Sequence, residues 1–226
     1  MNFLKLKLFN TLIGIGILVC YCSVSFAQQS GKTDAIYSGV PWYDQNGKVV
    51  SAHGANIIKV KDKFYLFGEA HTDTSNAFVG LNCYSSKDLN NWKFERIALP
   101  IQSNGKLGPN RVGERPKVMK NPQTGLYLMY MHVDTLGYKD QFVGYAIAKN
   151  VTGPYVDKDG KSLNEGGGSL VVQGDENYFG AGHNSAYTFD GKDYIFYHAY
   201  EKKTNGVPRL VVKEMLWDAD LWPVLK

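Results

Sequence analysis

One strand pattern occurs three times in this chain, and it restricts the possible folds more than any other feature. In each copy a polar residue opens a short strand, a turn follows, and an aromatic strand comes next. The aromatic strands cover residues 64–67, 127–130 and 194–197, and are offset by 63 and then 67 residues. A repeat of this size that consists of strands is typical of propeller-like arrays of β-sheet blades.

The polar residues that open these copies are His53, Glu114 and His183. They precede the aromatic strands by 11, 13 and 11 residues. If the three units are blades around one axis, the inner strands begin near that axis. We therefore expect these three side chains to meet there.

The first 27 residues have the pattern of a signal peptide. Lys5 and Lys7 precede an apolar run over residues 8–19, and small residues surround the expected cleavage site after Ala27. A membrane anchor is the alternative, but the apolar run is short for a span. We expect a mature domain over residues 28–226 that is secreted or periplasmic.

The cysteine count excludes an intrachain disulfide in the expected mature chain, and the charge gives no support for binding to nucleic acid or to an anionic membrane. Cys20 and Cys22 leave with the signal, so Cys83 alone remains and no intrachain disulfide can form. Removal of Lys5 and Lys7 lowers the formal charge from +4 to +2, which gives no basis for a nucleic acid or an anionic membrane as partner. About 199 residues suit a single domain with one core.

Alternation with a period of two and frequent turn signals predict strands throughout, with no amphipathic helix after the signal. Each unit supplies about four strands. The expected strands are 56–60, 64–69, 80–85 and 92–97, then 116–120, 126–133, 141–148 and a short one near Tyr155, then 183–189, 193–199, 209–216 and 222–225. A glycine-rich segment between residues 153 and 166 is the one visible candidate for an internal junction, although a plain loop is the alternative.

Two groups of motifs stand out. The first covers residues 52–54, 67–69, 83–92 and 113–118, and the second covers residues 153–160, 166–168, 180–185, 197–200 and 216–218. Both resemble glycoside hydrolase family 43: the first group is similar to its exo-β-1,3-galactanase branch and the second to its arabinanase-like members. The resemblance implies an all-β fold, a five-bladed β-propeller with a carboxylate site at the axis. Because we find about three units, we expect an incomplete propeller of about three blades.

The resemblance implies hydrolysis of glycosidic bonds with inversion of configuration. An inverting enzyme needs an acid and a base about 6.5–9.5 Å apart. Glu114 matches the carboxylate that is the tuner or an acid in the galactanase branch, although a structural ion pair with Arg115 or Lys117 is the alternative. His53 stands where much of the family has an aspartate base. The galactanase branch uses a glutamine instead, which we cannot place in this chain.

The resemblance also implies a calcium ion near His183, although a single imidazole with waters would bind calcium weakly. A satisfied core histidine is the alternative. Candidate sugar contacts are Glu69, Tyr84, Arg115, Tyr130 and Asn184. His71, His132 and His198 lie near the same strand ends, where a structural role is the simpler interpretation.

No residue matches the family's general acid. Residues 155–166 contain only Asp157, Asp159 and Glu165 as carboxylates, and none fits its motif. The sequence therefore leaves three hypotheses open. The protein is a glycosidase acting on arabinose- or galactose-containing plant polysaccharide, a carbohydrate-binding remnant without the acid, or a broken product without function. Open blade edges would favour self-association.

Overall fold

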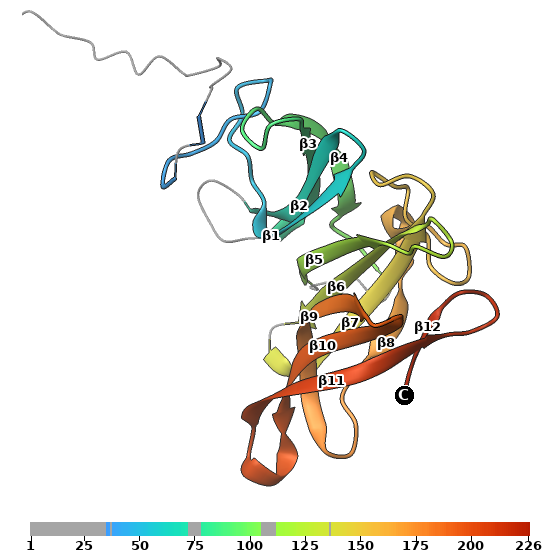
Figure 1. Cartoon of the computed structure of the whole chain (residues 1–226). Coiled ribbons are helices and arrows are strands. Elements are labelled where there is room, and N and C mark those ends of the chain that lie inside the picture. The colour runs from blue at the N-terminus through green and yellow to red at the C-terminus, as the bar shows by residue number, and fades with distance from the viewer. Residues whose placement is uncertain (1–34, 37, 72–77, 105–111, 136) are drawn as a thin grey trace, which may run out of the picture.

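The computed structural model describes residues 35–36, 38–71, 78–104, 112–135 and 137–226. These residues form three four-stranded antiparallel sheets that follow one another along the chain (Figure 1). Within the described residues there is no α-helix, and two short 3-10 turns, η1 (Leu163–Glu165) and η2 (Lys202–Thr204), interrupt the strands. The predicted all-β fold with three blade-like units is confirmed.

Each sheet is a meander in which neighbouring strands in the chain pair with each other. Most of the expected strands are present, extended by a few residues at their ends. The first sheet contains β1 (His53–Val60), β2 (Lys63–His71), β3 (Phe78–Ser86) and β4 (Lys93–Pro100). The second contains β5 (Val112–Lys120), β6 (Tyr127–Thr135), β7 (Gly137–Ala148) and β8 (Ser169–Val172), and the third β9 (Tyr178–Phe189), β10 (Lys192–Glu201), β11 (Val207–Trp217) and β12 (Pro223–Leu225).

Two apolar clusters hold the three sheets together. One cluster lies between the first and second sheets and includes Phe67, Leu81 and Met129. The other lies between the second and third sheets and includes Tyr130, Tyr145 and Ile195. The second sheet is therefore covered on both faces, and β6 over residues 127–133 and β7 over residues 143–148 are almost continuously buried. Burial on both faces replaces the in-and-out alternation expected for a half-exposed sheet.

The third sheet exposes apolar side chains on the face that points away from the second. Tyr187 and Phe189 on β9 and Leu210 on β11 are each more than three-fifths exposed. The strand register places them on one face of the sheet. No helix among the described residues is long and apolar enough to cross a membrane.

The short strand expected near Tyr155 is present only as an isolated bridge, and the fourth strand of the second sheet lies further along the chain. Val156, next to Tyr155, makes only isolated bridges, to Ile147 and to Ser162, whereas β8 pairs with β7. The Tyr155 ring is buried in the first cluster and its hydroxyl donates to the carbonyl of Val151, at 2.7 Å. Val156 thus meets the edge of β7 through one bridge, and the longer paired strand at this edge, β8, forms only after the glycine-rich segment.

The segment expected to hold an internal junction is an ordered loop on the second sheet. The carboxylate of Asp157 accepts hydrogen bonds from the backbone N–H groups of Asp159, Lys161 and Gly168, at 2.8 to 3.0 Å. Leu163 of η1 is buried in the first cluster. These contacts fix residues 157–168 against the rest of the fold. The expected signal peptide, residues 1–27, lies outside the described residues.

Candidate active site

The innermost strand of each sheet carries a β-bulge at the same place. The register shifts between His53 and Asn56 on β1, between Glu114 and Lys117 on β5, and after Gly182 on β9. One residue in each bulge has a left-handed backbone: Gly54 with φ of 60°, and Arg115 and His183 with φ of 49°. A bulge bends its strand and re-aims the side chains beside it. Here three bulges direct side chains toward the ends where β1, β5 and β9 lie side by side (Figure 1).

The bulges also correct the sequence alignment of the three units. His53, Glu114 and Gly182 are the residues that pair across to Glu69, His132 and His198 on the second strand of each sheet. His183 is therefore equivalent to Gly54 and Arg115, one position later than expected. All three bulges add one residue, so the error came from aligning the aromatic runs: Glu69 and His132 come five residues after Phe64 and Tyr127, whereas His198 comes four residues after Tyr194.

Glu114 lies in a partly exposed network at the end of β5. Its Oε2 accepts a short hydrogen bond from the guanidinium of Arg115, and it lies 3.6 Å from Nδ1 of His132. The same guanidinium nitrogen is 3.3 Å from that ring nitrogen. The His132 ring is almost fully buried, and about a quarter of the Glu114 side chain is exposed. The ion pair with Arg115 that the sequence left open as an alternative is thus present.

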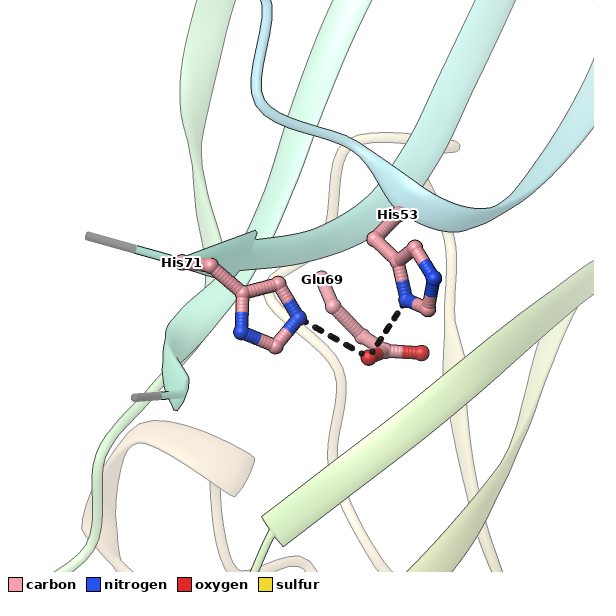
Figure 2. Close-up of side chains that lie close together, drawn as sticks. All are labelled: His53, Glu69 and His71. Atoms are coloured by element: carbon pink, nitrogen blue, oxygen red, sulfur yellow. Dashed lines mark hydrogen bonds and ion pairs between the residues drawn. The ribbon is translucent and has the colours of Figure 1, made fainter. Parts of the chain in front are cut away.

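Glu69 is a buried carboxylate at the end of β2, and it connects the first two sheets. Only 2% of its side chain is exposed. Its Oε1 accepts the backbone N–H of Arg115 at 2.8 Å, and its Oε2 lies 3.2 Å from Nδ1 of His53 and 3.1 Å from Nε2 of His71 (Figure 2). Gly54 makes this approach possible, because a Cβ there would stand 2.5 Å from Oε1 of Glu69.

The third sheet reaches the same region through β9 and β10. A Cβ at Gly182 would lie 2.8 Å from the His132 ring, so glycine allows the two sheets to approach. Burial and the positive charges of Arg115 and Lys117 lower the pKa of His183. Burial, with His183 and Arg115, also lowers the pKa of His198. Nearby cations oppose a calcium ion at His183, and the role of His183 as a calcium ligand stays a prediction.

Asn184 is fully buried beside these residues. Among the described residues, neither its amide nitrogen nor its oxygen has a hydrogen-bond partner, and the same holds for Nε2 of His198. Buried polar atoms normally find partners, in protein or in ordered water. The expected role of Asn184 in sugar binding stays a prediction.

Two tyrosines that were expected to contact sugar lie inside the fold. The Tyr84 hydroxyl accepts hydrogen bonds from the backbone of Ser51 and the side chain of Asn82, and its ring packs edge-on against Phe94. Tyr130 is buried between the second and third sheets, where burial raises the pKa of its hydroxyl. Neither ring exposes a face on which a sugar could stack, so both tyrosines affect the candidate site only through the packing of the sheets.

Sequence reasoning gave too little weight to three histidines. His71, His132 and His198 lie at the convergent strand ends, although each had a structural role as its simpler interpretation. The signal that could have identified them is their position opposite the polar residues of the inner strands. Glu201, at the end of β10, instead forms an exposed ion pair with Arg209.

A family model for "Glycosyl hydrolases family 43" matches residues 101–223, which is more than half of the chain. The chain belongs to glycosyl hydrolase family 43. The matched range includes Glu114, Arg115 and His132, and it confirms the resemblance found in the sequence. A solved family 43 structure, a β-1,3-galactosidase, is also similar in fold, which agrees with the blade-like sheets.

Proteins named as arabinan-degrading enzymes and as galactanases are both similar to this chain. The extracellular exo-α-(1→5)-L-arabinofuranosidase of Cellvibrio japonicus is 51% identical over 76 residues, covering 34% of this chain and 22% of the relative. The extracellular endo-α-(1→5)-L-arabinanase 1 of Bacillus subtilis is 31% identical over 123 residues, covering 51% and 35%. The exo-β-1,3-galactanase of Phanerochaete chrysosporium, solved with galactose, is 30% identical with a TM-score of 0.64, covering 84% and 40%. The chain thus spans between about a fifth and two fifths of these proteins' lengths.

Proposed function

We propose that this family 43 chain hydrolyses O-glycosidic bonds in arabinose- or galactose-containing plant polysaccharide, with inversion. The observation that carries the proposal is the position of Glu114, a partly exposed carboxylate held by Arg115 where the inner strands converge. The names of its relatives, which include arabinanases and a galactanase, supply the sugar class. Because those relatives are named extracellular, we also propose that the protein is exported.

Glu114 is proposed to tune the acid or to contact the sugar, and not to donate the proton from Oε2. A guanidinium only donates hydrogen bonds, so Oε2 of Glu114 is an acceptor in its bond with Arg115. The remaining N–H groups of Arg115 suit sugar hydroxyls as acceptors. The oxygens of Glu69 already face the Arg115 N–H and the rings of His53 and His71, so its expected sugar contact stays a prediction.

A carbohydrate-binding protein without catalysis is the second candidate. Asp157, the most buried carboxylate of the segment in which the acid was sought, accepts three backbone N–H bonds and so has a loop-forming role. General acid catalysis typically contributes about 10²–10⁴-fold in rate. A chain without this group would retain sugar contacts but little turnover.

The test is release of sugar from arabinan, β-1,3-galactan and arabinoxylan by the purified protein. Glu114→Gln is the active-site variant, and Glu201→Gln is the matched control because its carboxylate lies in an exposed ion pair with Arg209. We expect release to fall by about 100-fold or more in the first variant and to be unchanged in the second.

Three results distinguish the candidates. Release that Glu114→Gln does not reduce would contradict the role of Glu114. No release from a folded protein, together with calorimetric binding of arabinan or galactan oligosaccharides that Glu114→Gln weakens, would replace hydrolysis with binding. A folded protein that neither releases sugar nor binds these oligosaccharides would exclude both hydrolysis and carbohydrate binding.

A further inference from the structure

Three side chains at the ends of β1 and β2 bring ligand atoms for a metal ion together. Nδ1 of His53, Nε2 of His71 and Oε2 of Glu69 all lie within 4.8 Å of one another. Figure 2 shows the two rings on either side of the Glu69 carboxylate. Two of these separations, from Oε2 to each ring nitrogen, are 3.2 and 3.1 Å. We propose that these residues form a binding site for a divalent transition-metal ion of the zinc class.

The separations fit such an ion. Zinc binds imidazole nitrogen and carboxylate oxygen at about 2.0–2.2 Å, so two ligand atoms of a tetrahedral site lie about 3.4 Å apart. Both distances from Oε2 of Glu69 are close to this value. The third separation, between the two ring nitrogens, is at most 4.8 Å, and the His53 side chain, which is 70% exposed and meets the His71 ring edge-on, can shorten it by rotating.

The backbone around the three ligands is held in place. A Cβ at Gly68 would stand 2.5 Å from the backbone of Ala52, so the missing side chain lets β2 approach the chain just before His53. The backbone N–H of His71 donates to Oγ of Ser51 at 3.2 Å. These two contacts fix the positions from which His53, Glu69 and His71 project.

Glu69 is oriented by a bond to its other oxygen. Oε1 accepts the N–H of Arg115, which leaves Oε2 directed at the two rings. Hydrogen bonds that orient a metal ligand in this way raise metal affinity, and their loss typically costs about 10–100-fold. The proposed site therefore includes the hydrogen bond from the Arg115 N–H, which orients Glu69, as well as its three ligands.

The ligand types select the ion. Two imidazoles with one carboxylate suit zinc and its neighbours in the transition series, whereas calcium prefers six to eight oxygen ligands. Three protein ligands leave a fourth position for water or for an oxygen of a bound molecule. The exposure of His53 places this position on the solvent side of the cluster.

The competing arrangement has no ion and two imidazole N–H groups that donate to Glu69. Cobalt and zinc titrations distinguish the two. We would use the untagged chain carrying Cys20→Ser and Cys22→Ser, freed of metal by a chelator, so that neither a tag nor those thiols bind the ion. One equivalent of Zn²⁺ should bind by calorimetry, and Co²⁺ should give the intense visible absorption of a tetrahedral site.

His53→Ala and His71→Ala should each weaken Zn²⁺ binding by at least 10-fold, and Ca²⁺ should not compete. His53→Ala changes an exposed side chain and so keeps the fold, which circular dichroism would verify. Glu201→Gln is the control, because its carboxylate lies in an exposed ion pair with Arg209, and it should bind Zn²⁺ as the parent does. No bound Zn²⁺, binding that survives both ligand substitutions, or binding that is lost in Glu201→Gln would each overturn the proposal. The readout is binding, so it is independent of whether the chain hydrolyses polysaccharide.

Discussion

The backbone N–H of Arg115 donates a 2.8 Å hydrogen bond to Oε1 of Glu69 and so joins the second sheet to the first. Arg115 has a φ of 49° at its bulge, a conformation that costs a residue with a side chain about 1–2 kcal/mol. Glu69, which is almost fully buried, offers this strained segment an acceptor. The bond links the carboxylate of one sheet to the residue that holds Glu114 on the next.

Replacing Glu69 should therefore lower the free energy of unfolding. Glu69→Ala removes the acceptor of the Arg115 N–H, and an unsatisfied buried donor costs about 1–3 kcal/mol. Glu69→Gln retains an amide oxygen that can accept this bond, so its loss should be smaller. Urea denaturation in a chelator-containing buffer measures both. Equal losses in the two variants would show that charge, and not this hydrogen bond, decides the contribution of Glu69.

Gly54→Ala should destabilise the fold more than Gly160→Ala. Both glycines have positive φ, of 60° and 76°, so both variants carry the cost of a left-handed alanine. A Cβ at position 160 meets nothing within 4 Å, whereas at position 54 it collides with Oε1 of Glu69. We expect about 1–2 kcal/mol for Gly160→Ala and at least 1 kcal/mol more for Gly54→Ala. The same urea midpoint in both variants would contradict the close approach.

Cys83 should not react with thiol reagents in the native protein. It is fully buried in the first cluster, and burial raises the pKa of its thiol to about 12. The thiolate is the reactive form, so both access and ionisation are suppressed. Alkylation followed by peptide mass spectrometry should label Cys83 only in denaturant. Rapid labelling of the native protein at neutral pH would mean that the first and second sheets separate readily.

The stability of the protein should fall as the pH drops below about 6.5. The pKa values of His183 and His198 are lowered from 6.5, chiefly by burial, with Arg115 and Lys117 opposing and Glu69 favouring protonation of His183. The unfolded chain then binds protons at a higher pH than the folded one, so the free energy of unfolding decreases between 6.5 and the folded-state values.

Urea midpoints measured between pH 7.5 and 5 test this dependence, with His198→Gln as the comparison. The variant should show a flatter profile because one of the two histidines no longer titrates. A parent midpoint that is constant or rises toward pH 5 would contradict the direction of both shifts.

The exposed apolar face of the third sheet should make the protein self-associate. Tyr187, Phe189 and Leu210 lie on this face, and contiguous exposed apolar area favours association. Sedimentation velocity over a range of concentrations should show dimers or larger species, and Phe189→Lys with Leu210→Lys should reduce them. A monomer at every concentration would contradict self-association through this face.

The strands could be predicted from the sequence because their signals are local. Aromatic and β-branched alternation between turn residues marks β2, β6 and β10 within a few residues of their observed bounds. The family resemblance rested on short motifs such as residues 113–118, which the family match includes. The second sheet's last strand was missed because Ser169–Val172 is short and follows a loop that no local pattern connects to β7.

By itself, the sequence determined three antiparallel units, the turns between their strands, and the presence of Glu114 and Glu69 near inner strand ends. Only the tertiary structure decided which side chains meet. The bulges placed Gly182, and not His183, opposite His198, and packing between sheets buried Tyr84 and Tyr130. The approach of β2 to the chain before His53 joined His53 and His71 to Glu69. Local alternation carries no information on such contacts, because register at a bulge and distances between sheets depend on residues far apart in the chain.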